Sequence, residues 1–216
     1  MVRCARPPFG DVVEGRFISL EPLTRQLVPE LFAAIGHPQI FDGGYGGGPA
    51  AYRDTIEGFA QFAESYYAWD AANVHAIRLR GGPNDGLVVG TSTLGDFDVS
   101  LGYAHLGWTA YDPRVWGTVV NAEAKLLILG SAFDNGFERV KIQADVLNAR
   151  SRAAIQKLGA TFEGIARHDM RRADGAWRDS AIFSILSDEW AGVRRGLEWR
   201  LETQGGRPVE LRAGEE

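Results

Sequence analysis

The sequence is poor in residues that would support sulfur or metal chemistry. It has a single cysteine in 216 residues, Cys4, so an intrachain disulfide is excluded. Because Cys4 lies in an N-terminal segment that we expect to be flexible, we assign it no catalytic role. The four histidines have no metal-ligand spacing, so we expect no metal; they are His37, His75, His105 and His168.

Long apolar runs and an excess of positive charge are also missing. Residues 1–10 lack the apolar core of a signal peptide, and no run approaches the ~18 apolar residues of a membrane helix. The formal net charge of −5 gives no general case for binding nucleic acid or an anionic membrane. These absences favour a cytoplasmic enzyme. The length fits one domain, which we place at residues 16–201 between a flexible N-terminus (1–15) and a flexible C-terminal tail (202–216).

Hydrophobic periodicity predicts an alternation of strands and helices. The expected order is a strand (16–20), two helices (24–35 and 51–68), two strands (73–80 and 87–95), a strand (105–111), a helix from residue 118, a strand (140–146), a helix (151–158), two strands (161–171 and 177–186) and a helix (188–201). The glycine-rich segment 37–49 separates the first two helices. It follows no strand and has no Lys-Ser/Thr pair, so it does not fit a P-loop, and we expect a flexible loop.

A helix start that can bind an anion follows the strand at 105–111. Asp112-Pro113 ends that strand, because proline cannot donate to a ladder, and Thr118 is the expected N-cap of the next helix. The first-turn N–H groups of Val119, Val120 and Asn121 have no partners within the helix and can bind a phosphate. An ordinary capped helix explains the same pattern. The next strand ends at Leu147-Asn148, and Ser151 is the expected cap of the helix that follows.

Together these segments resemble the acyl-CoA-binding core of the GNAT acyltransferases over residues 17–187. The resemblance is to the branch with the ribosomal-protein alanine N-acetyltransferases and its succinyl-CoA transferase subgroup, which the run Asn121-Ala-Glu-Ala-Lys125 resembles most. The motifs that carry it are Gly107-Trp108, Trp116-Gly117, Glu123-Ala124, Asn148-x-x-Ser151 and Lys157-Leu158-Gly159-Ala160. It implies an α/β GNAT fold. In that fold a mixed, mostly antiparallel sheet of about seven strands has helices on both faces, and splayed strands form the acyl-CoA site.

One departure concerns the pyrophosphate loop, which in the family usually reads Arg/Gln-x-x-Gly-x-Gly/Ala. Here Trp116, Val119 and Asn121 stand at the matching positions, so the glycines that allow close backbone approach are missing. A capped helix start still offers its N–H groups, which makes this a variant loop. The resemblance implies that acyl-CoA contacts Trp108, Thr109, Trp116, Thr118, Val119, Val120, Asn121, Asn148 and Ser151.

Two residues are candidates for the chemistry. His105 stands on the strand before the cofactor loop, where many relatives carry a glutamate, and a neutral histidine suits base catalysis near pH 7. Tyr111 is the candidate acid for the departing CoA thiolate. Both positions are also compatible with packing roles alone. The glycine-rich segment is a candidate wall of the acceptor site, with Tyr45 and Tyr52 as contacts.

The resulting hypothesis is an N-acyltransferase that moves an acetyl or succinyl group from CoA to a primary amine by direct attack. The acceptor is a small molecule or a peptide, and a homo-oligomer is among the expected assemblies. The competing hypothesis is a regulatory or sensing protein that binds acyl-CoA without turnover.

Overall fold

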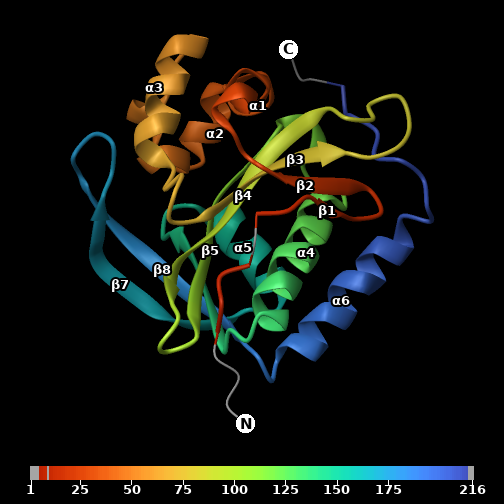
Figure 1. Ribbon diagram of the computed structural model, residues 1–216. Coiled ribbons are helices and arrows are strands. Elements are labelled where there is room, and N and C mark those ends of the chain that lie inside the picture. The colour runs from red at the N-terminus through yellow and green to blue at the C-terminus, as the bar shows by residue number, and fades with distance from the viewer. Residues whose placement is uncertain (1–4, 9, 214–216) are drawn as a thin grey trace.

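A single mixed sheet forms the centre of the molecule (Figure 1). The computed structural model describes residues 5–8 and 10–213. Eight strands lie in the order β1-β2-β3-β4-β5-β6-β8-β7, and within this part of the chain only the β5–β6 pair is parallel. The strands are β1 (Val13–Glu14), β2 (Ile18–Pro22), β3 (Asn73–Leu79), β4 (Val88–Asp98), β5 (Tyr103–Tyr111), β6 (Arg139–Asp145), β7 (Thr161–Arg171) and β8 (Trp177–Leu186).

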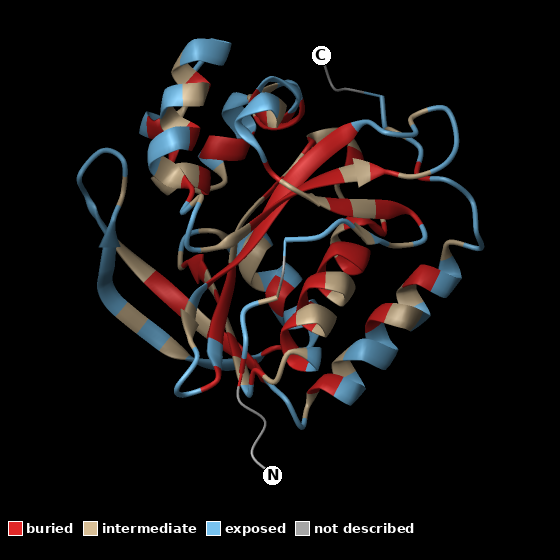
Figure 2. Cartoon of the chain, in the orientation of Figure 1, coloured by how far each residue is buried: buried red, intermediate tan, exposed pale blue. Residues whose placement is uncertain are grey.

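Helices cover both faces of the sheet, and each face has its own apolar cluster. On one face lie α1 (Val28–Ile35), α2 (Pro38–Asp42) and α3 (Ile56–Tyr66). On the other lie α4 (Val120–Asp134), α5 (Ala149–Leu158) and α6 (Trp190–Thr203). Four 3-10 turns complete the chain: η1 (Arg25–Leu27), η2 (Tyr45–Gly47), η3 (Pro49–Ala51) and η4 (Pro113–Val115). Buried residues concentrate in the central strands and on the inner side of the helices (Figure 2).

Strands β5 and β6 pair over only part of their length. The pairing runs from Tyr103↔Arg139 to Leu106↔Ile142, and β5 then continues to Tyr111 without β6. At this point the β4–β5 register shifts, and Trp108 adopts a φ of 47°, which is uncommon for a bulky residue. A β-bulge of this kind bends a strand, so the splayed strands that the resemblance implied are present.

The helix starts differ in detail from the sequence predictions. Val119 is the N-cap residue of α4, while the Thr118 hydroxyl accepts a hydrogen bond from the Val120 N–H at 3.3 Å. Asn148, not Ser151, caps α5: its side-chain oxygen accepts a hydrogen bond from the Ser151 N–H at 2.8 Å. Asparagine is a strong N-cap because its short amide reaches the first-turn donors.

The glycine-rich segment contains short helices where the sequence predicted a loop, and apolar residues near both described ends are buried. Residues 37–49 contain α2 and η2, and a Cβ on Gly46 would lie 2.9 Å from the Phe62 ring, so only glycine fits there. Ala5 is buried, and so is Val209, beyond the predicted end of the domain. Apolar side chains near both ends therefore join the core. Cys4 lies outside the described residues.

None of the helices described has the length and apolar character needed to cross a membrane.

Candidate active site

A histidine and an aspartate are paired at the centre of the sheet, on the face that α1 to α3 cover. His105 on β5 is 5% exposed, and its Nδ1 lies 2.9 Å from the Asp96 carboxylate on β4. The two residues meet because Gly95 pairs with His105 and the register then shifts, with Asp96 at a φ of 49°. A carboxylate that accepts a hydrogen bond from Nδ1–H favours the tautomer in which Nε2 carries the lone pair and can accept a proton.

The Nε2 atom of His105 is buried and has no hydrogen-bond partner among the described residues. It faces Gly107, where an added Cβ would lie only 3.0 Å away. Gly107 is the first residue of β5 past the pairing with β6. Burial lowers the pKa of His105 below its usual 6.5, and the hydrogen bond to Asp96 opposes this effect only in part. His105 is therefore neutral at pH 7, with a free nitrogen where the strands part.

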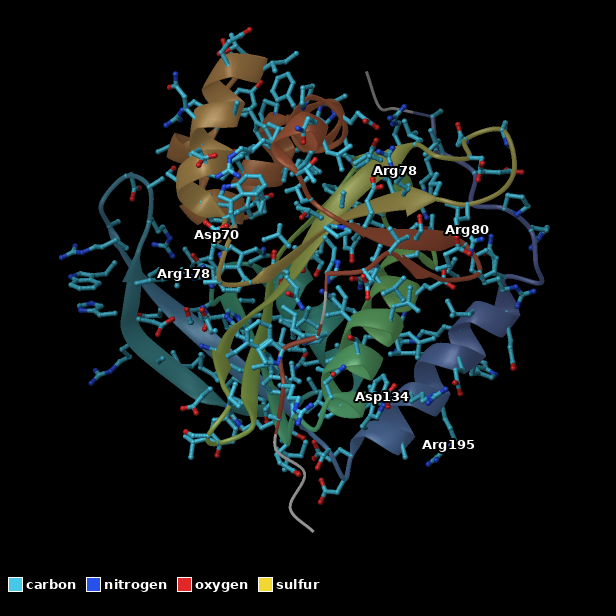
Figure 3. All side chains as sticks on the ribbon, in the orientation of Figure 1. Asp70, Arg78, Arg80, Asp134, Arg178 and Arg195 are labelled. Atoms are coloured by element: carbon cyan, nitrogen blue, oxygen red, sulfur yellow. The ribbon has the colours of Figure 1, made fainter. Side chains whose placement is uncertain are left out.

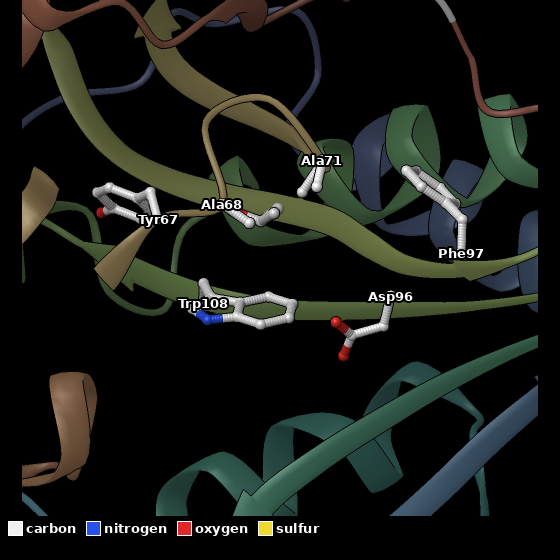
Figure 4. Close-up of a pocket in the computed structure, with 8 residues that line it drawn as sticks. Tyr67, Ala68, Ala71, Asp96, Phe97 and Trp108 are labelled. Atoms are coloured by element: carbon white, nitrogen blue, oxygen red, sulfur yellow. The ribbon is translucent and has the colours of Figure 1, made fainter. Parts of the chain in front are cut away.

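A cavity of about 290 Å³ lies on the same face and connects Asp96 to solvent (Figure 4). The Asp96 side chain is 59% exposed, although its partner His105 is buried. Trp108 forms another wall, with its ring 4.8 Å from that of His105. The remaining lining residues are Tyr67, Ala68, Ala71, Ala72, Thr93 and Phe97. A proton taken up by His105 can leave through Asp96 toward this cavity.

The expected cofactor residues gather around the splayed ends of β5 and β6. Trp116 donates its indole N–H to the Tyr111 carbonyl oxygen at 3.0 Å, which fixes the loop before α4. The guanidinium of Arg150, in the first turn of α5, lies 3.7 Å from the Trp116 ring centre. Arg150 forms no ion pair among the described residues. The start of α4 and a free cation on α5 thus face each other, an arrangement suited to a phosphate.

Asn148 has a structural role at the same place. Besides capping α5, its amide donates to the Gly43 carbonyl oxygen of the glycine-rich segment. Both ends of the side chain are therefore engaged. Contact between Asn148 or Ser151 and acyl-CoA remains a prediction of the resemblance.

A buried lysine lies beneath β5 on the α4 face. Lys125 donates to the hydroxyls of Ser92, at 3.0 Å, and Thr109, at 2.9 Å. Its side chain has no carboxylate partner in the described chain, and burial lowers its pKa to about 7. Tyr111 is on the same face with a buried hydroxyl that has no partner there, and burial raises its pKa well above 10. The phenol therefore keeps its proton at every working pH.

The two tyrosines predicted to contact the acceptor pack around Phe41. Tyr45 is 8% exposed and shares a hydrogen bond with the Tyr67 hydroxyl. Tyr52 is half-buried, with its ring 5.5 Å from that of Phe41. This cluster shapes the glycine-rich segment, and Tyr45 presents little surface to a ligand.

Three residues of this site were missed in the sequence: Asp96, Lys125 and Arg150. Asp96 falls one residue beyond the predicted end of its strand, and only the bulged register brings it to His105. In the sequence, Lys125 is a polar residue within a predicted helix and Arg150 lies in the turn before the next one, and polar residues at both kinds of position are usually solvated. Among residues 5–8 and 10–213, no three His, Cys, Asp or Glu side chains are grouped to hold a metal ion.

Comparison with known proteins identifies the family of this chain. A family model described as an acetyltransferase (GNAT) domain matches residues 18–161. The chain belongs to the GNAT acetyltransferase family. No curated protein sequence matches it. The GNAT match spans the elements from β2 to the start of β7 and includes both splayed strands.

Solved GNAT structures share the whole architecture. A T. thermophilus protein assigned as an acetyltransferase is 32% identical, with a TM-score of 0.79 over 89% of this chain and 98% of that one. A GCN5-related N-acetyltransferase from Brucella melitensis is 27% identical, with a TM-score of 0.81 over 97% and 95%. Mycobacterium smegmatis RimJ, solved with CoA-disulfide, is 18% identical with a TM-score of 0.70 over 95% and 100%, which supports the fold alone. Acyl transfer from acetyl-CoA is the activity class of this GNAT domain.

Proposed function

We propose that the protein is an N-acyltransferase in which His105 is the general base and Asp96 orients it. The observation that carries the proposal is the free, buried Nε2 of His105 at the point where β5 leaves β6. A base must reach the proton that it abstracts and must be unprotonated at working pH. His105 satisfies the second requirement because burial lowers its pKa.

The residues around the splayed strands fit an acyl-CoA. Its phosphates would lie at the first turn of α4, with the Arg150 guanidinium opposite, and this cation compensates for the missing loop glycines. Acyl-CoA supplies an acyl group activated as a thioester. The unpaired backbone of β5 beyond Leu106 offers N–H groups for the thioester oxygen, in the manner of an oxyanion hole.

The reaction proceeds by direct attack of the amine, with no covalent enzyme intermediate. His105 Nε2 accepts the proton that the attacking nitrogen loses, and Asp96 stabilises the imidazolium that results. Tyr111, the candidate acid from the sequence, keeps its proton because burial raises its pKa, so its proposed role is to donate a hydrogen bond to the departing thiolate, which takes its proton from solvent. Holding amine and thioester together supplies much of the rate.

The donor is acetyl-CoA in this proposal, and succinyl-CoA is the alternative within the same chemistry. The acceptor is a primary amine on a small molecule or peptide. A cytoplasmic location and homo-oligomerisation stay predictions of the sequence. The rival function is binding of acyl-CoA without turnover.

Thiol release from acetyl-CoA or succinyl-CoA with a panel of primary amines separates turnover from binding. We expect His105→Gln to lower kcat by about 100-fold, the low end for loss of a general base. Asp96→Asn should also lower kcat, because the amide no longer favours the Nδ1–H tautomer. The acidic limb of the parental pH profile should lie below pH 6.5, following the lowered pKa of His105. If His105→Gln retains the parental kcat across the pH range of the parental profile, His105 has only a structural role.

A further inference from the structure

One face of three adjacent strands carries four buried polar atoms that have no hydrogen-bond partner among the described residues. They are His105 Nε2 on β5, Gln143 Oε1 on β6, and Arg178 Nε and Ser180 Oγ on β8. The register places them on one face, because Ala104, Ile142 and Ala181 on these strands point into the α4 cluster and the four residues alternate with them. Buried polar atoms are nearly always paired, so a group of four that includes the proposed base indicates a ligand surface.

Arg178 is a desolvated cation without an anion of its own. It is half-buried, and burial lowers its pKa. Asp145 acts on it through space, but both Asp145 oxygens are taken by Arg172, at 2.7 to 2.9 Å. Figure 3 shows Arg178 between the β7–β8 hairpin and α3. A cation in this position is stabilised strongly by a carboxylate that arrives with its own hydrogen-bonding oxygens.

The bound anion should carry one charge. Asp145 and Asp169 both raise the pKa of Arg178, and Arg172 opposes them. Counting Arg178 itself, two carboxylates and two guanidiniums balance here, so a bound carboxylate adds less uncompensated negative charge than a doubly charged phosphate would. The neighbouring Ser180 hydroxyl can donate a further hydrogen bond to the carboxylate, whereas Gln143 Oε1 is an acceptor and suits the N–H groups of the amine end.

We infer that the acceptor is a primary amine that carries a carboxylate, with its nitrogen at His105 and its carboxylate at Arg178 and Ser180. The inference rests on the proposed function, because His105 defines the amine end. β5 and β8 are separated by two strand spacings, or roughly 10 Å. Along β8, Ser184 is level with His105 through Lys141, so Ser180 and Arg178 lie four and six residues further along that strand. The long Arg178 side chain shortens this offset, since its charge acts on His105 through space. Several bonds must therefore lie between the amine and the carboxylate, as in an ω-amino acid.

The test compares ω-amino carboxylates of four to seven carbons with alkylamines of equal length, using acetyl-CoA as donor. For the parent we expect kcat/KM to favour the carboxylates by about 10-fold or more at the best length. Arg178→Met should abolish this preference and leave the alkylamine rates within about 2-fold. Arg167→Met is the matched control, since Arg167 is an exposed arginine of the same hairpin, and it should behave as the parent. A parent without the preference, or a preference that survives in Arg178→Met, overturns the inference.

Calorimetry tests the same site without turnover. With CoA present, 6-aminohexanoate should bind the parent and the Arg167→Met control, and should bind Arg178→Met at least about 10-fold more weakly. Equal binding to all three, or binding to none, overturns the inference. Acetyl-CoA binding without acyl transfer to any amine counts against the proposed function instead, and the calorimetric result then still decides whether the Arg178 site exists. Ser180→Ala is the second variant if Arg178→Met does not fold.

Discussion

At the scale of single residues, the two nitrogens of His105 have different surroundings. Nδ1 faces the Asp96 carboxylate and Nε2 faces Gly107 with no partner in the described chain. Burial lowers the pKa of the ring while Asp96 raises it, and burial is the larger effect. The result is a neutral base with a fixed tautomer. Sequence could nominate His105 from its place on the strand, but its partner depends on a bulge that local sequence does not reveal.

Asn148 combines a capping role with a predicted cofactor role, and two substitutions separate them. Serine is as good an N-cap as asparagine, whereas alanine costs about 1 kcal/mol of stability. We expect Asn148→Ala to unfold at the lowest temperature and Asn148→Ser to lie between it and the parent, because serine restores the cap but not the hydrogen bond to the Gly43 carbonyl oxygen. If the side chain touches acyl-CoA, both variants bind acetyl-CoA more weakly in calorimetry. Parental affinity in Asn148→Ser would leave Asn148 with only its structural roles, the cap of α5 and the hydrogen bond to Gly43.

At the scale of elements, α4 and β5 enclose a lysine whose charge is not compensated. The apolar spacing of residues 122–133 predicted the helix, but Lys125 points into the sheet and bonds only to hydroxyls. Glu123 is likewise buried and accepts hydrogen bonds from the N–H groups of residues 16–18. Helical periodicity shows which face is apolar, but it cannot show that polar side chains also turn inward.

The lowered pKa of Lys125 has a consequence for stability. The pKa is about 7 in the folded protein and about 10.4 in an unfolded chain. Between these values the unfolded state holds more protons, so this residue makes stability rise as the pH increases from 7 to 10. Lys125→Met removes the buried charge and should stabilise the protein at pH 7 by on the order of 2 kcal/mol.

Denaturant unfolding at pH 7 and pH 9.5 provides the measurement. The difference in the free energy of unfolding between Lys125→Met and the parent should shrink at the higher pH, where the parental lysine is already neutral. Lys157→Met, at an exposed position on α5, should change stability by less than about 0.5 kcal/mol at either pH. If Lys125→Met is less stable than the parent at pH 7, the charge of Lys125 does not destabilise the folded protein, and the prediction is wrong.

The facing ends of α4 and α5 allow a second prediction for these elements. Arg150 stacks on Trp116 and forms no ion pair in the described chain, so its charge is free for a phosphate. Arg150→Ala should weaken CoA binding by about 10-fold, as expected for one charged hydrogen bond. Arg195→Ala on α6, labelled in Figure 3, is the control and should bind CoA as the parent does. If calorimetry gives the same CoA dissociation constant for the parent and for Arg150→Ala, Arg150 does not contact the cofactor.

For the whole molecule, the sequence predicted most of the strands and helices in their correct order. It could do so because apolar periodicity and the Pro and Gly punctuation are local properties. The mixed sheet and the splay of β5 from β6 came from the resemblance, and the structure confirms both. The pairings of Asp96 with His105 and of Asp145 with Arg172 could not be predicted, because they join residues that only the tertiary fold brings together.

Ligand binding should be visible in the stability of the whole domain, because the proposed acyl-CoA site is assembled from β5, α4 and α5 and exists only when these are folded. A ligand that binds only the folded state stabilises it by about 2.7 kcal/mol at 100 times its dissociation constant. For a domain of this size that corresponds to roughly 5 to 10 °C in Tm. Acetyl-CoA should raise the Tm of His105→Gln as much as that of the parent, since the imidazole acts on the amine, and should raise that of Arg150→Ala less. If millimolar acetyl-CoA gives neither a change in Tm nor a calorimetric heat, both hypotheses are wrong: the N-acyltransferase and the protein that binds acyl-CoA without turnover. A shift with no thiol release for any amine would favour the rival.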